Sequence, residues 1–258
     1  MAMLSTRRGE FNVVVSGPEA ALPLMFSNSL GATHIMWERQ AEALEGNFKV
    51  VCYDTRGHGD SSATPGDYAM ADLGGDALAI MDALNLPQVD FCGLSMGGMI
   101  GMWLAKNAPT RIRRLVVANS ATRIAPPSLW NERMATVSQH GMAAVADAII
   151  ARWFTADFIA QQPETVARIR LAMQKNPPHG YISCCAAVRD FDFQSQVSQI
   201  GHPVLVIAGD ADPATPPALT KQIADAITGA RFVLLPAAHL SNIECHHEFN
   251  QQLVAFFN

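Results

Sequence analysis

One serine stands in a segment whose pattern suits nucleophilic chemistry. Ser95 lies at the centre of Gly93-Leu94-Ser95-Met96-Gly97, which has the form G-x-S-x-G. An apolar run at 89–93 precedes it and a helical pattern at 96–107 follows, so the serine falls on a strand-to-helix turn. Such a turn holds the hydroxyl clear of the sheet, and small residues on either side let the backbones approach closely. We therefore predict that Ser95 is a nucleophile, although the bare pattern also fits an ordinary glycine-rich turn.

A serine nucleophile needs a base, and the base needs an acid that orients it. His239 lies between the last strand-like run and the last helical pattern, and Asp212 directly follows the preceding strand-like run. The order Ser, Asp, His is expected when all three stand at the carboxyl edge of one parallel sheet. We therefore predict Ser95, Asp212 and His239 as a catalytic triad, with Asp210 as the alternative acid.

Two backbone N–H groups are candidates for stabilising the negative oxygen that forms when a serine attacks a carbonyl. The Met96 N–H opens the helix after Ser95, where the helix dipole favours negative charge. The second donor is expected from Ser27-Asn28-Ser29-Leu30-Gly31, a small, turn-prone segment after an apolar run. We select the Leu30 N–H within it, while a plain polar loop is the other interpretation.

The elements that must position these residues follow an alternating rhythm of strand-like runs and helical patterns. This rhythm predicts an α/β protein with a mostly parallel sheet flanked by helices. The predicted strands are 11–15, 22–26, 48–53, 89–93, 115–118, 204–208 and 231–235. Between 121 and 190 the sequence is helical, with a proline pair near each end. We predict a core of residues 1–120 and 191–258, with a helical insertion at residues 121–190.

Composition and charge exclude several other classes of protein. The 258 residues carry 18 basic and 23 acidic side chains, a net charge of −5, so no nucleic-acid partner is expected. No apolar stretch reaches the roughly 20 residues of a membrane span, and the N-terminus lacks a secretory signal. Five cysteines without CxxC spacing suggest reduced thiols and a cytoplasmic location. His246, His247 and Glu248 lack the spacing of a zinc motif, so we expect no metal.

Several segments together carry a family resemblance. They are Ser27-Asn28-Ser29-Leu30-Gly31, Tyr53-Asp54-Thr55-Arg56-Gly57-His58-Gly59, Cys92-Gly93-Leu94-Ser95-Met96-Gly97-Gly98, Ser128-Leu129-Trp130-Asn131-Glu132-Arg133, Cys184-Cys185-Ala186-Ala187-Val188-Arg189-Asp190, Asp212-Pro213-Ala214-Thr215-Pro216-Pro217 and His239-Leu240-Ser241-Asn242-Ile243-Glu244. On these segments the chain resembles the α/β-hydrolase superfamily and, more narrowly, the 3-oxoadipate enol-lactonases of aromatic catabolism. The first segment and Cys-Cys-Ala-Ala are the more particular to the lactonases. The chain departs from the family at Cys245-His246-His247, where the family usually has Gln-Pro-Glu.

The resemblance implies an α/β-hydrolase fold with a helical cap inserted after the sixth strand. It also implies the same triad, the Leu30 and Met96 amides as oxyanion hole, and no cofactor. The implied reaction opens 3-oxoadipate enol-lactone to 3-oxoadipate in the β-ketoadipate pathway, through an acyl-enzyme on Ser95. The substrate would be a small anionic lactone, and neither a nucleic acid nor a membrane is implied as a partner. The oligomeric state stays open.

A carboxylate on the substrate needs a cationic partner, because a protein of net charge −5 repels it at long range. The insertion is the place to look, since it holds seven basic and five acidic residues. We predict Arg133 and Arg189 as candidates for the carboxylate, and Trp130 and Trp153 as flat walls for the ring. These arginines could also lie on the outer face of the insertion and the tryptophans in its core.

Other activities are compatible with the same triad, because fold and nucleophile do not determine the substrate. The alternatives within the fold are another carboxylesterase, a carbon–carbon bond hydrolase and a cofactor-free perhydrolase. A different class of protein, a non-catalytic ligand-binding protein that uses the hydrolase pocket, is a further alternative. Such a protein need not keep all three triad residues in order, as this chain does.

Overall fold

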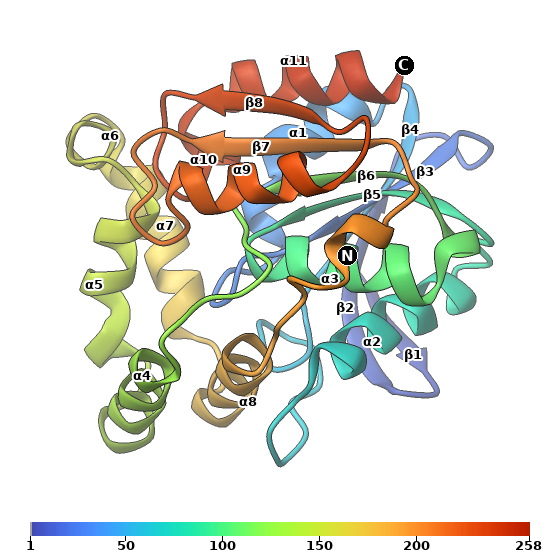
Figure 1. Ribbon diagram of the computed structural model, residues 1–258. Coiled ribbons are helices and arrows are strands. Elements are labelled where there is room, and N and C mark those ends of the chain that lie inside the picture. The colour runs from blue at the N-terminus through green and yellow to red at the C-terminus, as the bar shows by residue number, and fades with distance from the viewer. Residues whose placement is uncertain (1) are drawn as a thin grey trace.

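The computed structural model describes residues 2–258, which form one eight-stranded sheet with helices on both sides (Figure 1). The strands are β1 (Ala2–Thr6), β2 (Gly9–Ser16), β3 (Leu22–Ser27), β4 (Phe48–Tyr53), β5 (Val89–Leu94), β6 (Ile112–Ala118), β7 (Val204–Gly209) and β8 (Arg231–Leu235). Their order across the sheet is β1-β2-β4-β3-β5-β6-β7-β8. Strands β3 to β8 pair with one another in parallel, while β2 pairs antiparallel with both of its neighbours, β1 and β4. The predicted α/β class and mostly parallel sheet are confirmed.

The central strands were predictable because both of their faces are covered. Every residue of β4, β5 and β7 is buried, which requires a continuous apolar run and not an alternating one. Strand β1 was not predicted. Its sequence Ala-Met-Leu-Ser-Thr is mostly exposed at the edge of the sheet, so neither hydrophobic pattern marks it.

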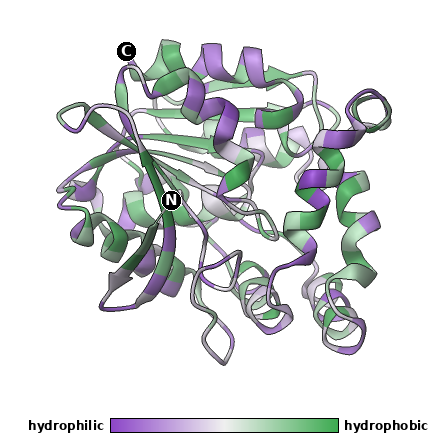
Figure 2. Cartoon of the chain, turned by 180° about the vertical axis from the view of Figure 1, so that it is seen from behind, coloured by the Kyte–Doolittle hydropathy of each residue, from purple (hydrophilic) through white to green (hydrophobic). Residues whose placement is uncertain are grey.

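Helices outside the cap cover the sheet, and they follow the loops that leave its carboxyl edge. They are α1 (Glu38–Leu44), α2 (Met70–Ala83), α3 (Met96–Asn107), α9 (Pro217–Ala226), α10 (Ser241–Glu244) and α11 (His246–Phe257), with short 3₁₀ turns at His34–Trp37, Pro109–Arg111 and Val197–Gln199. Helices α1 and α11 pack together, as do α2 and α3, while α9 packs on β7 and β8. Figure 2 shows the apolar strands enclosed between these helices.

Five helices lie between β6 and β7 and form the cap. They are α4 (Pro127–His140), α5 (Ala143–Trp153), α6 (Ala156–Gln161), α7 (Pro163–Gln174) and α8 (Pro178–Arg189). The arrowheads of β7 and β8 point toward them, so the cap stands over the carboxyl edge of the sheet (Figure 1). The insertion after the sixth strand is confirmed, while the boundaries at 121 and 190 stay a prediction. None of the helices within residues 2–258 is both long and apolar enough to span a membrane.

Candidate active site

Ser95 occupies a strained turn between β5 and α3. Its backbone has φ 58° and ψ −116°, a conformation that a residue with a side chain rarely adopts. The Ser95 N–H donates to the Ala118 carbonyl of the neighbouring strand at 2.8 Å, which holds the turn against the sheet. A Cβ at Gly93 would lie 2.0 Å from the Gly97 carbonyl oxygen. Glycine at position 93 therefore allows the bend that presents the Ser95 hydroxyl.

His239 and Asp212 are in direct contact at the ends of the last two strands. His239 Nδ1 lies 2.8 Å from Asp212 Oδ2, and both side chains are buried. The other carboxylate oxygen of Asp212 accepts the backbone N–H groups of Ala214 and Thr215 at 2.8 and 3.0 Å. Asp210, the alternative acid, is exposed to solvent. The contact with Asp212 fixes the orientation of the His239 ring.

The environment of Asp212 keeps it ionised. Burial by itself would raise the pKa of Asp212, but the contacts with His239, Asn119 and Thr215 outweigh it and lower the pKa to about 2. Asn119 donates from Nδ2 to Asp212 at 3.0 Å and to the Ala238 carbonyl at 3.2 Å. Asn119 thereby ties the acid to the loop that carries His239. Its part was not predicted, although its place after a central strand marked it as a residue of this edge.

The glutamate at the end of α10 links the His239 loop to the cap. The Glu244 carboxylate accepts the Ala238 N–H at 2.9 Å and the Thr155 N–H at 3.3 Å, and it also bonds the Thr155 hydroxyl. The Leu240 N–H donates to the Trp153 carbonyl at 2.9 Å. The loop that presents the base is therefore joined to the α5–α6 corner of the cap.

Ser95 and His239 line the same pocket, which lies between the cap and the carboxyl edge of the sheet. We call it the cap pocket. Its lining residues are Ser29, Leu30, Ser95, Ile124, Leu129, Trp130, Arg133, Ile149, Arg152, Trp153, Tyr181, Ala214, Thr215 and His239. The structure thus brings the predicted nucleophile and the predicted base, which are 144 positions apart in the chain, to one cavity.

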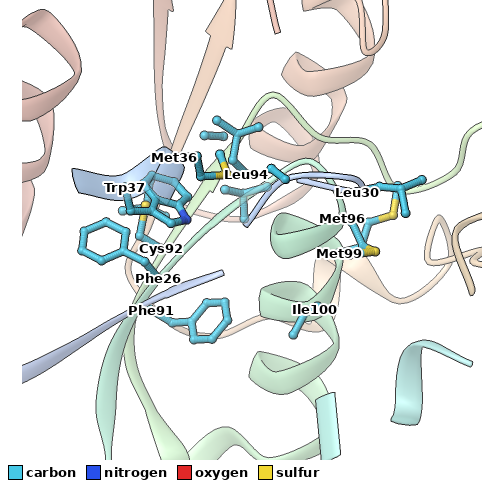
Figure 3. Packing of buried hydrophobic residues seen from close by; sticks show 14 of the residues in the cluster. Phe26, Leu30, Met36, Trp37, Phe91, Cys92, Leu94, Met96, Met99 and Ile100 are labelled. Carbon is cyan, nitrogen blue, oxygen red and sulfur yellow. The ribbon is translucent and has the colours of Figure 1, made fainter. Parts of the chain in front are cut away.

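The loop after β3 lies against the strand-to-helix turn at residues 93–97, which we call the elbow. The Gly97 N–H donates to the Asn28 carbonyl at 3.0 Å, and a Cβ at Gly97 would lie 2.1 Å from the Ser27 carbonyl oxygen. Figure 3 shows Leu30 beside Met96 at the start of α3. Among residues 2–258 no acceptor bonds the Leu30 N–H, and the first N–H of a helix has no partner within that helix. Both candidate oxyanion donors are therefore available to a ligand.

The buried side chain of His58 bonds the backbone of Gly31, the residue that follows Leu30 in this loop. The Gly31 N–H donates to His58 Nε2 at 2.8 Å, and His58 Nδ1 lies 3.2 Å from the Arg56 carbonyl. Burial lowers the pKa of His58 to about 4, because the charged ring would be desolvated. The neutral ring thus accepts at Nε2 and donates at Nδ1. His58 therefore braces the backbone of this loop.

Three of the four predicted cap residues line the cap pocket, and one does not. Trp130, Arg133 and Trp153 line it, with the Arg133 guanidinium carbon 4.9 Å from the centre of the Trp130 ring. Arg189 lies outside the pocket and forms a two-bond contact with Asp190, at 2.7 Å for each bond. We therefore leave Arg189 out of the site, because its charge is already neutralised by a neighbouring carboxylate.

Sequence reasoning missed two polar residues of the pocket, Arg152 and Tyr181. Arg152 precedes the predicted Trp153 on α5, and Tyr181 lies in the first turns of α8. Adjacent helix positions face directions about 100° apart, so the sequence could not show which of them points inward. Within residues 2–258 no group of three or more His, Cys, Asp or Glu side chains is placed to hold a metal ion.

The fold and this pocket define the class of protein. The family model for the alpha/beta hydrolase fold matches residues 23–244, and the chain belongs to that family. Among its relatives, 3-oxoadipate enol-lactonase 2 of Acinetobacter baylyi is 40% identical over 232 residues, which are 90% of this chain and 87% of the relative. 3-Oxoadipate enol-lactonase 1 of the same organism is 36% identical, covering 98% of this chain and 96% of the relative.

A solved structure agrees with these relatives. The crystal structure of the enol-lactonase from Burkholderia xenovorans LB400 superposes on this chain with a TM-score of 0.97 at 40% identity, covering 99% of both chains. A likeness of this extent includes the cap as well as the sheet. The resemblance inferred from the sequence segments is confirmed.

Proposed function

We propose that the protein hydrolyses 3-oxoadipate enol-lactone to 3-oxoadipate in the β-ketoadipate pathway. The relatives named enol-lactonases, at 36–40% identity over nearly the whole chain, support this substrate. One observation carries the proposal. The elbow serine, the Asp212-oriented histidine and an arginine of the cap line a single pocket. That arrangement suits an anionic ester whose carboxylate is held away from the reacting carbonyl.

In the first half of the reaction the ring carbonyl is attacked by Ser95. His239 takes the hydroxyl proton while Asp212 stabilises the imidazolium that forms. The tetrahedral oxyanion lies against the Leu30 and Met96 N–H groups, and losing one such donor raises a barrier by about 3 kcal/mol. The carbon–oxygen bond of the ring then breaks. The leaving enol takes the proton from His239 and can tautomerise to the ketone, so it leaves more easily than an alkoxide.

In the second half water releases the product. The ring oxygen stays on the acyl chain, so the leaving group and the ester are parts of one molecule attached to Ser95. His239, neutral again, accepts a proton from water, and the hydroxide adds to the acyl carbonyl between the same two amides. Collapse of this intermediate returns the proton to Ser95 and frees 3-oxoadipate. No other nucleophile is needed.

The cap supplies the part of the pocket that distinguishes substrates. We propose that residues 121–190 form this cap and that Arg133 binds the substrate carboxylate. The stacking of Arg133 on Trp130 supports this, since it holds the guanidinium at the pocket wall. Trp130 and Trp153 offer flat apolar faces to the unsaturated ring.

The test is a spectrophotometric assay of enol-lactone loss by the purified protein. We expect turnover of the enol-lactone, none of a ring-cleavage dienoate, and labelling by a serine-directed phosphonate. The Ser95→Ala variant should lose both turnover and labelling, with an unfolding midpoint close to that of the wild type. Turnover of the dienoate in place of the lactone would favour a carbon–carbon bond hydrolase. A wild-type protein inert to the phosphonate would favour a ligand-binding protein.

A further inference from the structure

Every polar side chain that lines the cap pocket outside the triad has a hydrogen-bond donor, although the Ser29, Thr215 and Tyr181 hydroxyls can also accept. Arg133 and Arg152 are cations, and Trp130 Nε1 and the Tyr181 hydroxyl can donate. No aspartate or glutamate is among the lining residues. A pocket with this lining attracts an acceptor-rich anion and repels a cation.

Both arginines of the pocket lack a carboxylate partner. Within residues 2–258, neither Arg133 nor Arg152 forms an ion pair, whereas eleven of the other twelve arginines do. The contact of Arg152 with protein acceptors is a single donation to the Pro213 carbonyl at 3.3 Å. Arg152 is half-buried, and burial and then the nearby charge of Arg133 lower its pKa. Two neighbouring cations that repel each other are stabilised by an anion between them.

Two buried side chains of the same pocket have polar atoms without a partner. Trp130 Nε1 and the Tyr181 hydroxyl are enclosed, and no group within residues 2–258 bonds either of them. Trp130 is 8% exposed and Tyr181 0% exposed. An unpartnered buried polar atom destabilises a fold, so its presence beside a pocket points to a ligand that satisfies it. Burial also raises the pKa of Tyr181, which keeps the phenol protonated and able to donate.

We propose that Arg152 and Tyr181 join Arg133 in binding the substrate carboxylate. Together the three residues select anionic lactones and dicarboxylates over neutral esters. The part of this inference that concerns the lactone rests on the proposed function. The binding chemistry itself applies to any short-chain carboxylate that fits the pocket. A guanidinium offers two parallel N–H donors to a carboxylate, and the phenol can donate to one of its oxygens.

The first experiment compares two substrates of which one carries the carboxylate and the other lacks it. One is the enol-lactone with its acetate arm, and the other is the same ring with a methyl group in place of that arm. We expect Arg152→Met to lower the ratio of their kcat/KM values by at least about tenfold, which corresponds to about 1.4 kcal/mol. Arg231→Met, at an exposed arginine without an ion pair, should leave the ratio unchanged. Equal losses on both substrates would assign Arg152 to holding the Pro213 loop and overturn the proposal.

The second experiment separates ligand binding from folding. Tyr181→Phe removes only the unpartnered hydroxyl, so the free energy of unfolding should stay the same or rise, while the same kcat/KM ratio falls. A loss of stability would mean that the hydroxyl has a partner in the folded protein. That result, or an unchanged ratio, would remove Tyr181 from the carboxylate site.

A binding measurement keeps the inference independent of the reaction. Adipate, a six-carbon dicarboxylate, should bind the wild-type protein in calorimetry. The Arg152→Met substitution should raise the dissociation constant of adipate by at least about tenfold. If the protein binds adipate in this way but does not open the enol-lactone, the proposed substrate is wrong and the carboxylate site stands. If it opens the lactone while Arg152→Met and the wild type bind adipate equally, the carboxylate site is wrong and the reaction stands.

Discussion

The buried His58 should make the stability of the protein depend on pH in a defined window. Its pKa is about 4 in the folded chain, against 6.5 for an ordinary histidine. As pH falls, the unfolded chain therefore takes up this proton before the folded chain does. The free energy of unfolding decreases through the window from about 6.5 to about 4 and then levels off.

The expected magnitude follows from these two pKa values. The whole difference corresponds to about 3 kcal/mol, at 1.36 kcal/mol for each pH unit. Between pH 8 and pH 5 the linkage relation gives a loss of about 2 kcal/mol from His58 alone. Asp212 contributes little there, since its pKa of about 2 lies below its ordinary value of 3.8 and its stabilisation is lost only below about pH 4.

Urea unfolding of the wild type and of His58→Gln at pH 8 and pH 5 measures this effect. Glutamine has no charge in this range, so every other titrating group contributes equally to both proteins and cancels in the comparison. We expect the wild type to lose about 2 kcal/mol more than the variant between the two pH values. Equal losses would refute the reasoning, because they would mean that His58 takes up a proton in the folded protein as easily as in the unfolded chain.

Three further substitutions test other parts of the site. Asp212→Asn should lower kcat by about 10⁴-fold, because the amide cannot accept from both the imidazole and its neighbours; a loss below tenfold would contradict the orienting role. Gly97→Ala should lower kcat by about 10²-fold, since the new methyl group would push the elbow away from Ser27, whereas Gly46→Ala, which has open space, should not; assays of both variants decide this. Glu244→Gln should lower the free energy of unfolding by about 1–3 kcal/mol in urea titrations, because it weakens bonds to a charged acceptor.

Much of this architecture could be predicted because it depends on local pattern and chain order. The central strands are apolar on both faces, and the elbow needs small residues on both sides of Ser95. The contact between Asp212 and His239 follows from two loops at the same edge of a parallel sheet. None of these features requires knowledge of how distant helices are oriented.

The cap was harder to predict because helix orientation decides which of its side chains reach the pocket. Arg133 and Arg189 looked alike in sequence, yet one stacks on a pocket tryptophan and the other pairs with its neighbour Asp190. Arg152 and Tyr181 carried no pattern that distinguished them from other residues of amphipathic helices. Strand β1 escaped notice for a different reason, since an exposed edge strand has no buried face to mark it.

One side chain of the cap bears on attempts to redesign this protein by exchanging its cap. Asn176, between α7 and α8, donates from Nδ2 to the Gly31 carbonyl at 2.7 Å and accepts the Gly59 N–H at 2.8 Å. Asn176 therefore links two loops of the core to the cap, and one of these loops carries the Leu30 amide. A chimera with a foreign cap would gain a new ligand preference. It would lose the hydrogen bonds to Gly31 and Gly59 unless the new cap had an asparagine at the same place.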